Sequence, residues 1–208
     1  MEYEDEVTGD TSTGAITLGR SAFDGCVKLA TIENGKRITT AYDSAFSGCT
    51  SLTSIDITGL RISGDYVFSG CSNLSEIETD VNTAFGAYMF RNCGKITSFE
   101  VKASRIPDGL FSGCSSLESV TFSAQTVYYM GKEAFKNTAI EEIKLPNGTY
   151  ELGANLFANC TSLGKVTLSE NTKITFGATP FDGCTAFETI AIKNGNTSHT
   201  VEDGILYN

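Results

Sequence analysis

One short motif occurs eight times along the chain, and this repetition limits the fold more than any other feature. Each copy reads approximately Phe-x-Gly/Asn-Cys-x-x-Leu-x-x-Ile, first at residues 23–32 and last at residues 181–190. Successive anchor phenylalanines are 23, 22, 22, 21, 24, 22 and 24 residues apart. A constant period of about 20–50 residues is typical of solenoids, in which every unit is one coil stacked on its neighbours. The anchors are Phe23, Phe46, Phe68, Phe90, Phe111, Phe135, Phe157 and Phe181.

The second half of each motif predicts a strand. Residues 52–57, Leu-Thr-Ser-Ile-Asp-Ile, alternate apolar and polar side chains, which is the period of a half-buried strand. Stacking such strands in parallel, about 4.8 Å apart, builds one long sheet. The segment that returns to the next anchor is too short and too rich in Gly and Thr for a long helix. We expect short extended pieces there, with one tight helical or 3₁₀ turn around the Ala-Phe pair.

The full unit, Ile-x-x-Ile-Gly-x-x-Ala-Phe-x-Gly-Cys-x-x-Leu-x-x-Ile-x-Ile, resembles the BspA-like (Treponema-type) leucine-rich repeat from about residue 14 to residue 208. The resemblance implies a strand-dominated α/β leucine-rich-repeat solenoid. It would have about eight coils of ~23 residues, stacked into a curved right-handed array with a parallel sheet on its concave face. The family occurs on bacterial cell surfaces and is implied in adhesion and in binding host or matrix proteins.

The same comparison suggests how the chain is divided. We expect an N-terminal tail or cap at residues 1–13, the eight-unit array at residues 14–193 and a C-terminal capping segment at residues 194–208. The last segment resembles the family's Asp-Gly-Ile-Leu-Tyr-Asn ending, which usually leads into further sequence, so we expect a fragment of a longer protein. The sixth unit carries Thr138 in place of Cys and is one residue shorter, which predicts a local kink.

All seven cysteines occupy the same position of the repeat. A disulfide framework, a metal cluster or a nucleophile are the functional alternatives, but spacing near 23 excludes a Cys-x-x-Cys zinc motif. Replacement by Thr138 in one unit favours a ladder of buried, reduced thiols that act as small apolar residues. We therefore predict a structural role for the anchor phenylalanines and for Cys26, Cys49, Cys71, Cys93, Cys114, Cys160 and Cys184.

Outward residues of the strands should line one continuous surface, and this surface is the predicted ligand-binding site. Its first half is acidic, which indicates a docking surface for a basic partner or a cation. The alternative is a solubilising face that discourages aggregation. The predicted site residues are Glu33, Asp56, Glu76, Glu78, Glu100, Glu142, Lys144 and Lys165. Exposed tyrosines should lie instead on the return segments: Tyr42, Tyr66, Tyr88, Tyr128, Tyr129 and Tyr150.

Charge and composition exclude several classes of function. The formal net charge of -10 argues against nucleic acid and against anionic membrane surfaces. No apolar run approaches the ~20 residues of a membrane helix. The single histidine, His199, has no nucleophile motif beside it, and the sequence contains no phosphate loop. We expect no catalysis, no cofactor and no metal.

Together these features predict a monomeric cell-surface or secreted module for ligand binding or adhesion, with a protein or glycan as its partner. The alternatives are a passive structural spacer and an intracellular protein-interaction scaffold. An enzyme is the third and most distant alternative. It would require a deep pocket, and an open strand surface gives no reason to expect one.

Overall fold

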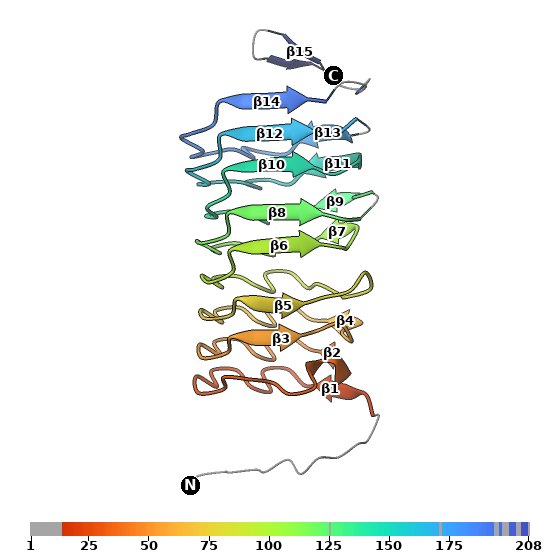
Figure 1. The fold of residues 1–208 in the computed structure, drawn as a ribbon, viewed down its shortest axis with the longest axis vertical. Helices are drawn as coiled ribbons and strands as arrows, with labels where there is room; N and C mark the ends of the chain where they lie inside the picture. The colour runs from red at the N-terminus through yellow and green to blue at the C-terminus, as the bar shows by residue number, and fades with distance from the viewer. Residues whose placement is uncertain are drawn as a thin grey trace.

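The coils stack one above another like rungs, as Figure 1 shows for the computed structural model of the chain. It describes residues 14–124, 126–170, 172–193, 196, 200–202 and 205–207. The fold is a strand-dominated solenoid of about eight turns, as predicted. Within the described residues the only helix is the 3₁₀ turn η1 (Gly35–Arg37). The proposed N-terminal segment 1–13 and His199 lie outside the described residues.

The predicted strands form in seven of the eight coils, and we call them the front strands. Apolar side chains at alternate positions point into the core, and the intervening side chains face solvent: in β6 the order is exposed, buried, exposed, buried. This alternation confirms the period-2 interpretation. The front strands are β3 (Ser54–Asp56), β5 (Glu76–Glu78), β6 (Ser98–Val101), β8 (Ser119–Phe122), β10 (Glu142–Leu145), β12 (Lys165–Leu168) and β14 (Thr189–Ile192).

The return segments are more regular than the sequence predicts, because they also pair in parallel. One return sheet has the order β1-β2-β4 and the other the order β13-β11-β9-β7. After the last coil, β15 (Thr200–Glu202) and β16 (Ile205–Tyr207) form an antiparallel pair. The return strands are β1 (Ile16–Leu18), β2 (Ile38–Ala41), β4 (Ile62–Ser63), β7 (Arg105–Ile106), β9 (Tyr129–Met130), β11 (Gly148–Leu152) and β13 (Thr172–Phe176).

The first coil departs from the prediction. Its expected front strand, around Ile32, is absent from the described structure, and Glu33 lies in a turn ahead of η1. The turn arises at Asn34, whose φ of 54° is left-handed, followed by Gly35. A Cβ on Gly35 would lie 2.5 Å from the carbonyl oxygen of Asp56, so η1, which follows the expected strand, packs directly against β3.

The anchor turns hold neighbouring coils together through three one-way hydrogen-bond ladders. In the first coil the N–H groups of Ser21, Phe23 and Gly25 donate to carbonyls of the second coil, at 2.9, 2.7 and 2.7 Å. The same three positions repeat this pattern at every following coil interface through Asn159. Residues two before and two after each anchor have positive φ, which aims these N–H groups along the stack. The second of these positions is always Gly or Asn, the residues that tolerate left-handed backbone best.

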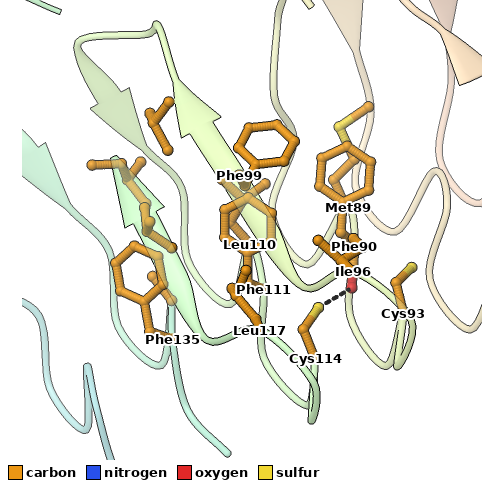
Figure 2. Packing of buried hydrophobic residues seen from close by; sticks show 14 of the residues in the cluster. Met89, Phe90, Cys93, Ile96, Phe99, Leu110, Phe111, Cys114, Leu117 and Phe135 are labelled. Atoms are coloured by element: carbon orange, nitrogen blue, oxygen red, sulfur yellow. Dashed lines mark hydrogen bonds between the residues drawn. The ribbon is translucent and has the colours of Figure 1, made fainter. Parts of the chain in front are cut away.

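The anchor phenylalanines form a continuous stack through the core (Figure 2). Ring centroids of successive anchors are 5.2 to 6.0 Å apart, and the rings are nearly parallel. Six anchors from Phe46 to Phe157 are fully buried, whereas Phe23 is 39% exposed at the open end. This is the core that the repeat predicts: no unit buries its apolar face alone, and neighbours bury it jointly.

Each cysteine after the first donates its Sγ hydrogen to the carbonyl of the preceding coil's anchor, as Cys114 does to Phe90 at 3.0 Å (Figure 2). All seven cysteines are free. The predicted ladder of buried thiols therefore forms, except that Cys26 is exposed and Cys184 is only partly buried at the two ends. In the sixth coil Thr138 instead donates its hydroxyl to its own anchor, Phe135, at 2.8 Å.

Hydrogen bonding in the front sheet is interrupted at two places among the described residues, between β5 and β6 and between β8 and β10. The two longest anchor separations, 5.9 Å for Phe68–Phe90 and 6.0 Å for Phe111–Phe135, fall at the same coil interfaces. At the first, Phe99 replaces the usual aliphatic residue and packs 4.8 Å from Phe111. At the second interface the shortened turn carries Thr138, which donates to its own anchor and not to the carbonyl of Phe111 in the preceding coil. The sequence predicts only this second irregularity.

Candidate functional site: the front face

The two interruptions of the front sheet coincide with hollows in its outer face. The first hollow lies between β5 and β6 and has a volume of about 420 Å³. Glu78 and Glu100, two of the predicted site residues, line it together. Ile77 is only partly buried there, although the equivalent residues of the other central coils are buried. A missing strand pairing therefore produces a recess with an apolar floor and carboxylates at its edges.

A lysine outside the predicted set also lines this hollow. The Nζ of Lys102 lies 3.7 Å from a carboxylate oxygen of Glu100 and donates to the carbonyl of Thr79 at 3.0 Å. Lys102 thus connects the segment after β6 to the segment after β5, at an interface where these two strands are not hydrogen-bonded to each other. No signal in the sequence distinguishes it, because its contact depends on the widened spacing between the coils. Half-exposed ion pairs of this kind contribute about 0–1 kcal/mol.

The second hollow, about 470 Å³, lies between β8 and β10 and reaches β12. It brings together Glu142, Lys144 and Lys165, three further predicted residues, with Glu118 and Glu141, which were not predicted. Glu142 and Lys165 are register partners on adjacent strands. Because both signs of charge alternate here, this hollow has no strong preference for a charged ligand.

The remaining predicted residues lie apart from these hollows or play a local role. Asp56 and Glu78 are register partners on β3 and β5, so two carboxylates are adjacent there, as predicted. Asp56, however, accepts hydrogen bonds from the N–H and the hydroxyl of Thr58, at 2.9 and 2.6 Å, and so shapes its own turn. Glu76 is exposed on β5 beside the first hollow. Glu33 is exposed in the turn before η1, in a coil that has no front strand among the described residues.

The buried cysteines have the wrong electrostatics for nucleophilic chemistry. Burial raises the pKa of Cys71 and of Cys114 from an ordinary value of 9.0 to about 12, and that of Cys184 to about 11. A reactive cysteine needs the opposite shift, since the thiolate is the nucleophile. Among the described residues no group of three or more His, Cys, Asp and Glu side chains is placed to hold a metal ion. Nor does any described helix have the length and apolar character to cross a bilayer.

Solved structures with the same architecture are bacterial leucine-rich-repeat proteins. A Bacteroides ovatus protein matches 85% of this chain with a TM-score of 0.63 and 21% identity. A leucine-rich-repeat protein of T. pallidum matches 85% with a TM-score of 0.62 and 24% identity, over 79% of its own length. A Eubacterium ventriosum protein matches 66% with a TM-score of 0.56 and 23% identity. This chain spans 58% of the Bacteroides protein and 37% of the Eubacterium protein.

The family comparison agrees with the repeat pattern. No curated protein matches the chain. The model of the BspA-type leucine-rich repeat region, present in six copies, matches residues 10–105 and 83–208. Leucine-rich repeats are extended scaffolds whose stacked strands present binding surfaces. With the coil stack and the anchor turns in place, the match shows that the chain belongs to the BspA-type leucine-rich-repeat family.

Proposed function

We propose that the protein is a non-catalytic adhesion or ligand-binding module that docks a basic segment of a protein partner on the acidic half of its front face. The observation that carries the proposal is the convergence of Glu78 and Glu100 on one hollow with a partly apolar floor. Arg or Lys side chains of a ligand would reach the carboxylates, while their aliphatic stems cover Ile77 and Phe99. The exposed pair between Glu100 and Lys102 is weak enough to exchange for a ligand cation.

The charge distribution along the front face supports a basic rather than an acidic partner. Asp56, Glu76, Glu78 and Glu100 occupy three strands, with Lys102 as the neighbouring cation. Carboxylates on adjacent strands repel one another and mildly destabilise the sheet. A bound cationic segment would relieve this repulsion, and the long-range field would accelerate its encounter at low salt.

Peptide selection tests this proposal, because it reads out the chemistry of a preferred ligand directly. Displayed random peptides selected on the immobilised protein should be enriched in Arg and Lys, and their binding should weaken as salt rises. The double variant Glu78→Gln/Glu100→Gln should raise the Kd of the selected peptides about tenfold, from two surface charge interactions of ~0.7 kcal/mol each.

The matched control is Asp182→Asn/Glu188→Gln, which removes the same charge from two exposed residues of the last coil. It should leave the Kd of the selected peptides unchanged. Peptides without a basic bias, or equal losses in both double variants, would refute the docking site and favour a passive spacer.

We also place the module outside the cell, at the cell surface or in secreted form, as part of the same proposal. The family resemblance supports this location. Brief protease treatment of intact source cells, followed by immunodetection, should remove the protein while sparing a cytoplasmic marker. Protection of the protein equal to that of the marker would favour an intracellular scaffold.

A further inference from the structure

The return side of the solenoid carries a second recess that the proposed function does not use. It lies beside β9 and β11, has a volume of about 380 Å³, and is lined by Asp108, Tyr128, Tyr129, Lys132 and Glu151 with the backbone of Gly153. Its lining combines aromatic rings with charged groups of both signs. The front-face hollows, by contrast, include no tyrosine.

Close stacking of the coils brings the backbone of Gly153 to the lining of this recess, beside Met130 and Ala154. A Cβ on Gly153 would lie 2.5 Å from the carbonyl carbon of Gly131, and a Cβ on Gly131 would lie 2.4 Å from the backbone nitrogen of Asp108. Both positions therefore require glycine for the close approach of neighbouring coils, and of the two only Gly153 lines the recess.

One wall of the recess is a fixed aromatic ring. Tyr129 donates its hydroxyl hydrogen to Asp108 Oδ1 at 2.6 Å, and the guanidinium carbon of Arg105 lies 4.6 Å from the ring centroid. These two contacts fix the ring from its tip and from one face. Beside it, the side chain of Tyr128 is 64% exposed.

The polar groups of the recess include two that are available to a ligand. Neither Glu151 nor Lys132 forms an ion pair or a side-chain hydrogen bond among the described residues. A second aromatic surface begins one residue beyond Asp108, where Gly109 leaves room for the ring of Tyr88. That ring stacks 5.1 Å from the ring of Tyr66. Aromatic surface and hydrogen-bonding groups thus continue past the recess.

We propose that this recess binds a neutral oligosaccharide. Hydroxyl groups of a sugar can donate to the carboxylates of Asp108 and Glu151 and accept from Lys132, while the apolar C–H face of a ring packs on the tyrosines. An anionic glycan fits poorly, since two carboxylates face it against one ammonium group. An apolar ligand fits poorly as well, because it would cover the charged groups of Asp108, Lys132 and Glu151.

Ligand-observed saturation-transfer NMR and titration calorimetry with cellohexaose and chitohexaose test the proposal, with hexagalacturonate as the anionic comparison. Both neutral hexamers present flat C–H faces, and at least one should bind, with saturation reaching its ring protons. Tyr128→Ala and, separately, Glu151→Gln should each raise the Kd roughly tenfold. Both residues are exposed, so thermal melts of these variants should match that of the wild type.

Two controls locate the site. Tyr42→Ala removes another exposed tyrosine, four coils away, and should leave the Kd unchanged. The front-face variant Glu78→Gln/Glu100→Gln should also bind the sugar normally, which separates this proposal from peptide docking. Absence of binding by both neutral hexamers, equal binding of hexagalacturonate, or unchanged affinity in both recess variants would overturn the proposal.

Discussion

Truncation of an anchor phenylalanine should destabilise the protein according to the position of its coil in the stack. Phe111 is fully buried, with the rings of Phe99, Phe90 and Phe135 at centroid distances of 4.8, 5.7 and 6.0 Å. Phe111→Ala would leave a cavity with packed walls on both sides. The expected loss in free energy of unfolding is therefore at the upper end of the usual range, about 4–5 kcal/mol.

Phe23 has a different environment. It is 39% exposed and stacks on a single anchor, Phe46, at 5.2 Å. Because about 60% of its surface is buried, only that share of the 1.5–3 kcal/mol transfer free energy of a phenylalanine is lost, or about 1–2 kcal/mol. No closed cavity forms at an open end. We therefore expect Phe111→Ala to cost about 2–4 kcal/mol more than Phe23→Ala.

Urea denaturation followed by far-UV circular dichroism measures this difference. The chain has eight tyrosines and no tryptophan, so tyrosine fluorescence serves as the second probe. Coincidence of the two probes is needed before a single free energy is assigned, because repeat arrays can lose cooperativity. Equal losses in the two variants, or a larger loss for Phe23→Ala, would refute the picture of stability as a sum of contacts between adjacent coils.

Two further predictions concern the thiol ladder and the tyrosine stack. Unfolded thiols ionise above their ordinary pKa of 9.0, whereas burial holds Cys71 and Cys114 protonated to about pH 12. The contribution of the buried thiols to the free energy of unfolding should therefore be fully present below pH 9. Above pH 9 the free energy of unfolding should fall by up to ~1.4 kcal/mol per pH unit for each thiol. The urea concentration at the midpoint of unfolding, measured from pH 7 to 10.5, should show this fall. Its slope against pH should be shallower in the double variant Cys71→Ala/Cys114→Ala than in the wild type, and identical slopes in the two proteins would contradict the prediction. In Gly109→Ala the new Cβ would lie 2.1 Å from the ring of Tyr88, at a φ of 59°, and should cost ~1–3 kcal/mol. Tyr88→Ala should remove part of that cost in a double-mutant cycle, and strictly additive losses would rule out the clash.

The sequence predicts the coil well because each repeat position has one dominant physical role. Period-2 alternation located the front strands, and the Gly or Asn two residues after each anchor marked a left-handed turn. The other left-handed position, two residues before the anchor, was not predictable. Residues as different as Ser44, Tyr66 and Glu133 occupy it, since the N–H ladder between coils imposes the conformation whatever the side chain.

The candidate sites depend on differences between coils, which the consensus does not show. Glu78 and Glu100 were selected as neighbours on adjacent strands, yet they meet at a hollow because β5 and β6 do not pair. Phe99 replaces an aliphatic residue at this interface, but one larger side chain does not reveal whether two coils separate. The recess at Tyr128 and Glu151 escaped prediction for a related reason: return segments carry no strong periodicity, so their pairing and register were unknown.

The one-way ladders of the anchor turns align the peptide dipoles along one edge of the stack. Every ladder N–H points toward the C-terminal neighbour, and every acceptor carbonyl points back. Aligned peptide dipoles add, as they do along a helix, with partial positive charge where unused N–H groups gather. In the last coil the N–H groups of Thr179, Phe181 and Gly183 have no backbone acceptor within the described residues. Backbone N–H groups on the return side, such as Gly64 to Ala41 and Gly153 to Met130, donate in the opposite direction, so the aligned dipoles are confined to the anchor-turn edge of the solenoid.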